Sequence, residues 1–271
     1  MCHELDSLPA VPRGSNIAVE RERFILTASD GARFAAVAAR PQESTSVGVL
    51  ILPDNRGLSG FYGELAERLA ESGHTALAID YFGRTAGVDE RGPEFPVMEH
   101  LMRVTRQGLD ADIAAAVGHL RSEAGGASRH VFALGFCFGG RQAFLATTLG
   151  HRLTGVIGFY GFPGVLFGAP GPTQRAGDIA SPVLAIWGGA DVNMPPSEIA
   201  AFDEAMTGAG VDHEMVTYPG APHSFFDIKH QEFAEVSADA WRRTGQFIRR
   251  YSAISESATG TAPAPPAWPA S

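Results

Sequence analysis

Residues 130–150, HVFALGFCFGGRQAFLATTLG, combine a continuous apolar run, a cysteine between glycines and a segment with the residues of a helix. A continuous apolar run such as HVFALGF is typical of a strand buried on both faces of a parallel sheet. The letters GFCFG then have the glycine–x–nucleophile–x–glycine spacing of a sharp strand-to-helix turn. This stretch therefore predicts an α/β fold in which Cys137 stands at the apex of such a turn.

The glycines beside Cys137 have a physical reason if the turn presents a nucleophile. A residue at the apex has a strained backbone, and a Cβ atom at the flanking positions would strike neighbouring elements. Gly135 and Gly139 supply the space. The helix that begins near Phe138 directs its N-terminal amides at the sulfur, which favours a thiolate and offers a donor to an oxyanion.

Two other interpretations fit this motif when it is taken alone. A single cysteine after a buried strand can be a small core residue, and glycine-rich strand-to-helix turns also occur in nucleotide-binding folds. The turn lacks the G-x-G-x-x-G spacing and lies in the middle of the chain, which argues against a nucleotide site. The local sequence leaves the core cysteine and the nucleophile as open alternatives.

Strands and helices are predicted to alternate along the chain. The predicted strands cover 23–28, 33–40, 47–53, 75–81, 130–136, 155–162, 183–189 and 213–220, and the helices outside the elbow cover 61–72, 104–123, 197–210 and 231–251, with a loop at 82–102. The first two strands flank Asp30-Gly31, which is a hairpin signal. We therefore expect a mostly parallel sheet covered by helices on both faces, with an N-terminal antiparallel strand pair.

Length and composition predict one domain with two flanking segments. The chain has 271 residues and 45% of them are apolar, which is enough for a large buried core. We expect the domain to cover 21–251, after an N-terminal extension at 1–20. Residues 252–271 are rich in Pro and Ala and predict a disordered tail.

Charge and cysteine content exclude several classes of function. The formal net charge is -9 and the 21 Lys and Arg residues form no long block, so we expect neither nucleic acid nor a membrane as a partner. Because no signal region and no stretch of ~18 apolar residues is present, we expect a cytoplasmic protein. We expect it to be a monomer or a small homo-oligomer. Two cysteines are too few for a disulfide framework, and Cys2 beside His3 lacks further metal ligands.

Two residues downstream complete a pattern with Cys137. Asp191 follows the predicted strand 183–189, and His223 follows the predicted strand 213–220. Taken singly, Asp191 fits an ordinary turn or a helix N-cap, and His223 is one of nine histidines. Because nucleophile, acid and histidine occur in this order at the carboxyl ends of strands, we favour a catalytic triad.

With these residues in place, the sequence resembles the dienelactone hydrolase family, the cysteine branch of the α/β-hydrolases. The resemblance rests on GFCFGG, GGAD and PHSFF, with support from AIDYFGR and the opening MCHE, and covers roughly residues 20–250. It implies an α/β-hydrolase fold in which Cys137 is the nucleophile, His223 the base and Asp191 the acid that orients the histidine.

The resemblance also implies roles for residues around the cysteine. Asp54 stands where the family has a glutamate that pairs with the resting cysteine, and the backbone N–H of Asn55 would join that of Phe138 in an oxyanion hole. Of the two arginines that hold a dienelactone carboxylate, Arg84 matches the first, whereas Asp227 stands at the second and would repel a carboxylate. The reaction type carries over, but the dienelactone substrate does not.

Aromatic residues lie beside the catalytic segments and predict an apolar pocket for a small molecule. Among them, Tyr160 and Phe225 are the expected substrate contacts, next to Arg84. The expected function is a carboxymethylenebutenolidase-like hydrolase that cleaves a small ester or lactone through an acyl-cysteine. We expect no metal and no organic cofactor, because no step of this acyl-cysteine hydrolysis needs one. Two alternatives stay open: an acyltransferase or cyclase that uses the same intermediate, and a catalytically silent ligand-binding or redox-sensing protein of this fold.

Overall fold

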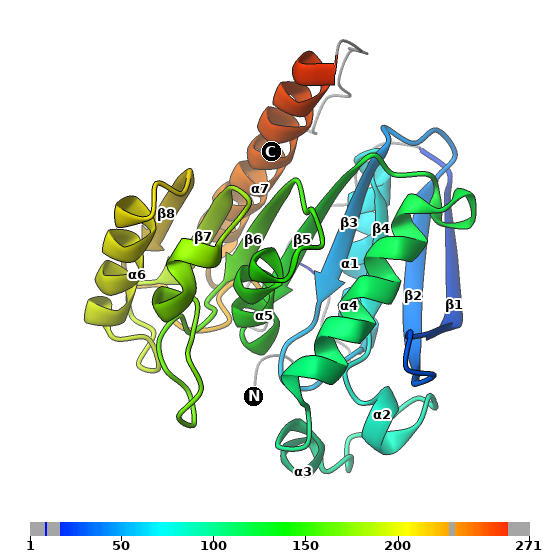
Figure 1. Ribbon diagram of the computed structural model, residues 1–271, viewed down its shortest axis with the longest axis horizontal. Helices are drawn as coiled ribbons and strands as arrows, with labels where there is room; N and C mark the ends of the chain where they lie inside the picture. The colour runs from blue at the N-terminus through cyan, green and yellow to red at the C-terminus, as the bar shows by residue number, and fades with distance from the viewer. Residues whose placement is uncertain (1–8, 10–16, 228–230, 260–271) are drawn as a thin grey trace.

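The computed structural model describes Pro9, residues 17–227 and residues 231–259 of the chain, and its centre is one eight-stranded sheet (Figure 1). The strand order is β1-β2-β4-β3-β5-β6-β7-β8. The strands are β1 Val19–Thr27, β2 Arg33–Pro41, β3 Val47–Leu52, β4 Thr75–Ile79, β5 His130–Phe136, β6 Gly155–Phe159, β7 Val183–Gly188 and β8 His213–Tyr218.

The N-terminal strand pair is antiparallel, as predicted. Phe24 of β1 lies opposite Ala36 of β2, and β2 also runs antiparallel to β4. Asp30 and Gly31 form the connecting turn, where Gly31 has a φ of 84° and Asp30 Oδ1 accepts the Ala32 N–H at 3.2 Å. Glycine suits this position because side chains disfavour positive φ.

The remaining strands pair in parallel, from β4 through β3 to β8. Every residue of β3, β4, β5, β6 and β7 is buried, which explains why their sequences are apolar without alternation. Parallel strands all end at one edge of a sheet, so the segments that follow β3, β5, β6, β7 and β8 meet there.

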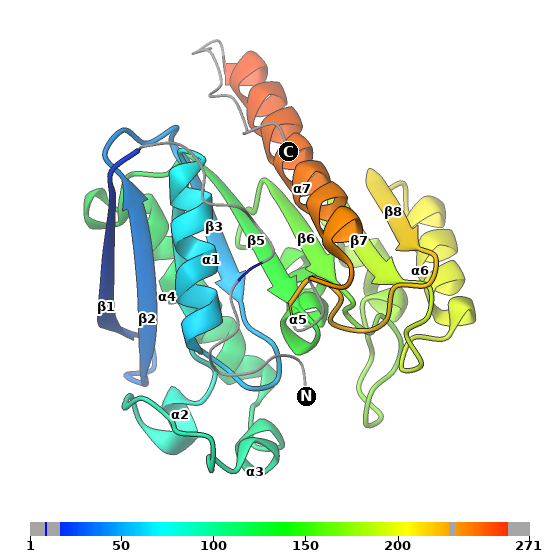
Figure 2. The same cartoon turned by 180° about the vertical axis from the view of Figure 1, so that it is seen from behind.

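Helices cover both faces of the sheet. Figure 1 shows α4, α5 and α6 in front of the strands, and Figure 2 shows α1 and α7 on the opposite face. The helices are α1 Gly60–Glu71, α2 Gly83–Ala86, α3 Val97–Leu101, α4 Arg106–Arg121, α5 Phe138–Ala146, α6 Pro196–Gly208 and α7 Ala234–Thr259. The architecture confirms the predicted α/β-hydrolase arrangement.

Several element bounds differ from the sequence prediction by two to four residues, and two differences are larger. The segment 82–102, expected to be a loop, contains the short helices α2 and α3. Helix α7 continues past the expected boundary at residue 251 and ends at Thr259, because the sequence SAISESAT contains no helix breaker before Gly260. The rest of the expected tail, 260–271, and most of the expected N-terminal extension lie outside the described residues.

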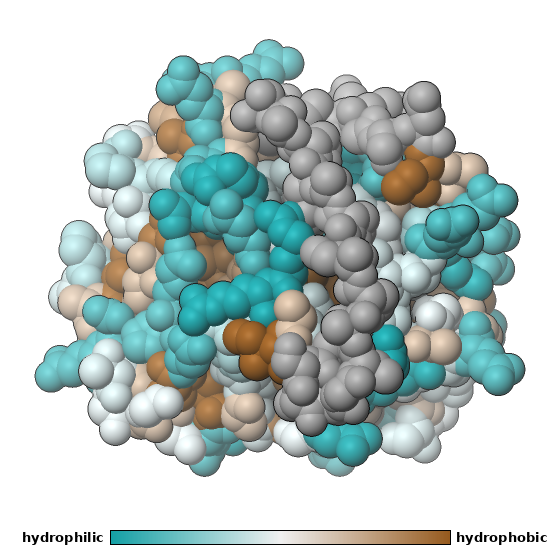
Figure 3. Space-filling model, turned by 90° about the horizontal axis from the view of Figure 1, so that it is seen from above, coloured by the Kyte–Doolittle hydropathy of each residue, from teal (hydrophilic) through white to brown (hydrophobic). Residues whose placement is uncertain are grey.

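The surface is predominantly hydrophilic on the face shown in Figure 3, where apolar residues are scattered among polar ones. Within the part of the chain that the structure describes, no helix combines the length and the apolar character needed to span a membrane.

A buried histidine at the start of β4 makes the stability depend on pH. His74 is 2% exposed, and its Nδ1 atom lies 2.9 Å from the hydroxyl of Thr45. Burial, assisted by the positive charge of Arg249, lowers the pKa of His74 to about 4. The unfolded chain has a histidine pKa of about 6.5 and therefore binds a proton between these values that the folded chain does not.

We expect the free energy of unfolding to fall as the pH decreases from about 6.5 toward 4, with His74 accounting for a loss of about 2 kcal/mol near pH 4.5. Urea denaturation of the wild type and of His74→Gln at pH 7 and pH 4.5 measures this contribution. The difference between the two pH values should be smaller in the variant, and an equal difference in both proteins would contradict the assignment.

Candidate active site

Cys137 occupies the turn between β5 and α5 and has a φ of 53° and a ψ of -114°. Positive φ is uncommon for a residue with a side chain and is found at turns that hold a strained conformation. The Cys137 N–H donates to the Phe159 carbonyl oxygen at 2.9 Å, and its carbonyl oxygen accepts the Arg141 N–H at 3.1 Å. The backbone of the cysteine is therefore fixed from both sides, and the thiol is half-buried and forms no disulfide.

Three glycines allow α5 to begin directly against the sheet. A Cβ atom at Gly135 would overlap the carbonyl group of Gly139, and one at Gly139 would overlap the carbonyl oxygens of Leu52 and Pro53. A Cβ atom at Gly140 would lie 2.6 Å from the Phe159 carbonyl oxygen. All of these contacts are with backbone atoms, which cannot move aside without displacing β3, α5 or β6.

Asp191 and His223 form a close pair at the same edge of the sheet. His223 Nδ1 lies 2.5 Å from Asp191 Oδ2, and the second oxygen of Asp191 accepts the Asn193 N–H at 2.9 Å. The Asp191 side chain is fully buried, whereas that of His223 is 23% exposed. Because the carboxylate accepts from Nδ1, Nε2 is the imidazole nitrogen that can act as a base.

Tyr160 connects the histidine with the end of β6. Its ring centroid lies 4.9 Å from that of His223, and its chain neighbour Phe159 accepts the Cys137 N–H. The Tyr160 hydroxyl donates to Asp227 Oδ2 at 3.2 Å, and Asp227 is fully buried. Asp227 is therefore a buried partner of Tyr160, and its expected repulsion of a substrate carboxylate stays a prediction.

Asp54 begins the turn after β3 and is fully buried. Its Oδ1 atom accepts the Arg56 N–H at 2.8 Å, and its carbonyl oxygen accepts the Gly57 N–H at 3.2 Å, where Gly57 has a φ of 78°. The Asp54 N–H donates to the Tyr62 hydroxyl at 2.8 Å. These bonds fix the shape of the turn that contains Asn55, the expected oxyanion residue.

Tyr81 joins this turn to the end of β4, since its hydroxyl donates to the Pro53 carbonyl oxygen at 2.7 Å. Burial raises the pKa of Tyr81 well above its ordinary value, and the charges of Asp54, Asp80 and Cys137 act in the same direction. Its ring also meets that of Phe138 at 5.2 Å. Tyr81 therefore contacts both the turn after β3 and the first residue of α5.

A cavity of about 670 Å³ adjoins this region and is lined by Asn55. The three expected substrate contacts do not line it. Phe225 is fully buried and packs against Phe159, Tyr160 and Tyr218, so it belongs to the core. Arg84 donates to Asp30 at 2.6 Å and to Asp112 at 2.8 Å. These two carboxylates, which sequence reasoning did not connect with Arg84, raise its pKa and hold its guanidinium.

The buried carboxylate of Asp80 holds the loops that surround the cavity. It lies at the end of β4 and forms an ion pair with Arg91 at 2.7 Å. Burial raises the pKa of Asp80, while Arg91 and the backbone N–H groups of Phe82 and Leu58 favour its charged form. Arg91 also lies over the Phe95 ring, 4.9 Å from its centroid. One carboxylate thus connects two segments of the cavity wall, the turn at Leu58 and the loop at Arg91, with the segment at Phe82.

No cluster of three or more His, Cys, Asp or Glu side chains with the arrangement of a metal site occurs in the described part of the chain. The adjacent Cys2 and His3, considered above as a weak metal motif, lie outside the described residues.

Comparison with known proteins assigns the chain to a family. A model of the dienelactone hydrolase family matches residues 34–252. The chain belongs to the dienelactone hydrolase family. Membership confirms the class expected from GFCFGG, GGAD and PHSFF, a carboxylic-ester hydrolase with the α/β-hydrolase fold.

Relatives of this family member resemble it over most of its length. A carboxymethylenebutenolidase from Rhodococcus opacus is 28% identical over 265 residues, which cover 94% of this chain and 98% of the relative. The structure of P91, a dienelactone hydrolase-like promiscuous phosphotriesterase from metagenomic libraries, has a TM-score of 0.69 at 24% identity and covers 85% of this chain and 98% of its own. An esterase from Pyrococcus furiosus has a TM-score of 0.66 at 15% identity, covering 90% of this chain and 98% of its own. The two structures support the fold.

The sequence of this dienelactone hydrolase family member did not indicate several contacts that shape the site. Tyr62 and Tyr81 fix the turn after β3, and Arg91 reaches Asp80 from a loop without regular structure. Arg84 and Asp112 are 28 positions apart, and no local pattern relates them. An aspartate directly after an apolar strand, as in AIDYF, is the one signal from which a partner for Asp80 could have been predicted.

We expect Gly139→Ala to lower the free energy of unfolding by more than about 2 kcal/mol, because the new Cβ atom would overlap two backbone carbonyl oxygens. Gly118→Ala is the matched control, since Gly118 lies exposed in α4, where an added Cβ atom would meet no neighbouring element within 4 Å, and it should stabilise by roughly 0.5–1 kcal/mol. Urea denaturation measures both. Equal stability of the two variants would contradict the close approach of α5 to β3.

Proposed function

We propose that this protein hydrolyses small carboxylic esters and lactones through an acyl-cysteine at Cys137. The observation that carries the proposal is the convergence of a cysteine at positive φ and the His223–Asp191 pair, 2.5 Å apart, on the end of β6. A nucleophile, a base and an acid that orients the base are the components of covalent acyl transfer.

The reaction has two stages. His223 Nε2 takes the proton of the Cys137 thiol, or stabilises the thiolate, and the sulfur attacks the carbonyl carbon of the ester. The tetrahedral adduct collapses, the C–O bond breaks, and the histidine returns the proton to the leaving alcohol oxygen. Water, deprotonated by the same nitrogen, then attacks the thioester and releases the acid and the thiol. In a lactone the leaving oxygen stays attached to the acyl chain.

The negative charge on the carbonyl oxygen needs donors in each stage. We assign them to the backbone N–H groups of Asn55 and Phe138, which follow β3 and β5 at neighbouring positions in the sheet. The fixed turn around Asp54 supports this role, because donors that need no rearrangement stabilise a developing charge best. We assign to Asp54 the pairing with the resting cysteine.

The choice of sulfur limits the substrates. A thiolate is a good nucleophile and also a good leaving group, so its tetrahedral adduct with an amide expels sulfur before the poorer amine. We therefore propose activity on esters with good leaving groups and on strained lactones, and little activity on amides. A thiol nucleophile must also remain reduced, which fits the cytoplasm.

Dienelactone itself is a less suitable substrate. The Rhodococcus relative is a carboxymethylenebutenolidase by name. In this chain, however, the first expected carboxylate-binding residue, Arg84, pairs with Asp30 and Asp112, and Asp227 occupies the second position as a buried partner of Tyr160. We propose the same chemistry on a different acid component.

We expect Cys137→Ala to abolish hydrolysis of p-nitrophenyl acetate, lowering kcat/KM by at least about 10³-fold, because no other group forms the covalent intermediate. Cys2→Ala, which removes the only other thiol, should leave kcat/KM within about twofold. Release of p-nitrophenolate measures both. Full activity of Cys137→Ala would overturn the proposed function.

A further inference from the structure

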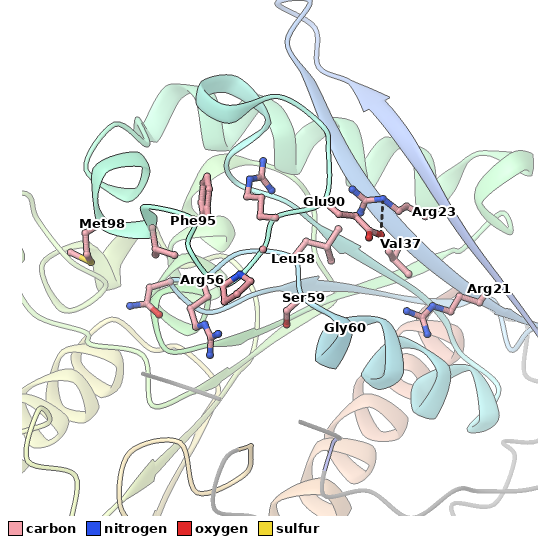
Figure 4. Close-up of a pocket in the computed structure, with 15 residues that line it drawn as sticks. Arg21, Arg23, Val37, Arg56, Leu58, Ser59, Gly60, Glu90, Phe95 and Met98 are labelled. Carbon is pink, nitrogen blue, oxygen red and sulfur yellow. Dashed lines mark ion pairs between the residues drawn. The ribbon is translucent and has the colours of Figure 1, made fainter. Parts of the chain in front are cut away.

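A cavity of about 670 Å³ lies beside the proposed oxyanion hole, between the turn after β3, the first residues of α1, strands β1 and β2, and the loop before α3. Figure 4 shows that it is elongated, with Met98, Phe95 and Arg56 toward one end and Arg21 and Arg23 toward the other. We call it the arginine cavity, because Arg21, Arg23, Arg56 and Arg91 line it.

The charge of this cavity is opposite to that of the protein. The chain has a formal net charge of -9, yet the lining contains four arginines and a single acidic residue, Glu90. A concave site with low-dielectric walls concentrates the field of the charges that line it. The arginine cavity is therefore suited to attract an anion even though the protein as a whole repels one.

Carboxylates of the protein neutralise three of the four arginines. Arg21 Nη1 lies 3.0 Å from Glu67, Arg23 Nε lies 3.6 Å from Glu90, and Arg91 Nη1 lies 2.7 Å from Asp80. These arginines hold the walls of the cavity together.

Arg56 differs from the other three. Its side chain makes no hydrogen bond and no ion pair with any described residue, and its Nη1 atom is buried. Arg56 as a whole is half-buried, but a buried N–H donor without a partner is costly and calls for an explanation. An oxyanion of a bound molecule would supply both the missing hydrogen-bond acceptor and the missing negative charge.

Position and surroundings define what such a molecule would be. Asn55, whose N–H is assigned to the oxyanion, precedes Arg56 and lines the same cavity, so one molecule can reach both. Leu58, Phe95, Val97 and Met98 provide apolar wall between the charged groups. A ligand that fits has a reactive ester near Asn55, an apolar body and an anionic group.

We propose that the arginine cavity binds the extended, anionic part of the substrate, and that Arg56 pairs with a carboxylate or phosphate group on it. This inference rests on the proposed function for the position of the ester. It places recognition of the anion at Arg56, in a cavity that Arg84 does not line, and it makes the preferred substrate an amphipathic anionic ester.

The test compares esters that differ only in charge. Mono-p-nitrophenyl glutarate carries a carboxylate on the acyl side, and its methyl ester is the neutral partner. 4-Acetoxybenzoate and its methyl ester form the same pair on the leaving-group side. 4-Acetoxyphenyl phosphate and its neutral dimethyl ester form the phosphate pair. The variants are Arg56→Met, Arg56→Lys and Arg103→Met, the last removing an exposed arginine that does not line the cavity. Thermal unfolding verifies that each variant is folded.

We expect the wild type to prefer at least one anionic ester over its neutral partner by about 10–100-fold in kcat/KM, the range of a hydrogen-bonded charge pair. Arg56→Met should remove this preference and Arg56→Lys should restore part of it, whereas Arg103→Met should retain both the preference and the activity on the neutral ester. The pair of esters that loses its charge preference in Arg56→Met, carboxylate or phosphate, identifies the anion that Arg56 binds. Equal charge preference in the wild type and Arg56→Met would overturn the inference.

A binding measurement separates this inference from the proposed function. Calorimetric titration of the wild type and of Arg56→Met with glutarate and with inorganic phosphate requires no turnover. Weaker binding to the variant supports the anion site even if no ester is hydrolysed, in which case only the proposed function fails. Equal binding of both anions to the two proteins contradicts the anion site, while hydrolysis of neutral esters still supports the proposed function.

Discussion

The site depends on how closely the first turn of α5 approaches the carboxyl ends of β3 and β6. Gly135, Gly139 and Gly140 make this approach possible, because a side chain at any of them would meet backbone carbonyl groups. The approach places the start of α5 beside the turn after β3, so that two backbone segments can offer N–H groups to one oxygen atom. It also forces Cys137 into positive φ, where its N–H is held by Phe159. The fold and the proposed chemistry therefore both depend on the close packing of α5 against β3 and β6.

Beside this constraint, a buried carboxylate holds the walls of the arginine cavity together. Asp80 holds Arg91 and lies against the turns at Leu58 and Phe82, so the wall of the arginine cavity depends on a carboxylate that burial disfavours and that Arg91 compensates. Buried Asp112 and exposed Asp30 hold Arg84 by ion pairs. Arg56 is the lining arginine that the described residues leave uncompensated. An arginine that is paired with a carboxylate of the protein has a structural role. An arginine without such a partner among the described residues, such as Arg56, can bind an anionic group of a substrate.

The fold was predictable because its signals are local. Apolar runs of five to seven residues mark the buried strands, and the glycine pattern around Cys137 marks the elbow. Asp191 and His223 were also predictable, since both follow strands and parallel strands end at one edge. The contacts of the expected substrate residues Arg84 and Phe225 were not predictable. Whether Arg84 or Phe225 faces a pocket depends on partners far away in the sequence, such as Asp112 and Tyr218, and neither hydrophobic periodicity nor a motif encodes those contacts.

The central claim is that Cys137 carries the acyl group. Mass spectrometry of the protein quenched during turnover of an activated ester, followed by peptide mapping, tests it most directly. The account predicts a mass increase equal to the acyl group on the peptide that contains Cys137, which disappears as the ester is consumed. Turnover with the acyl group on a different residue, such as Ser224, would contradict the account.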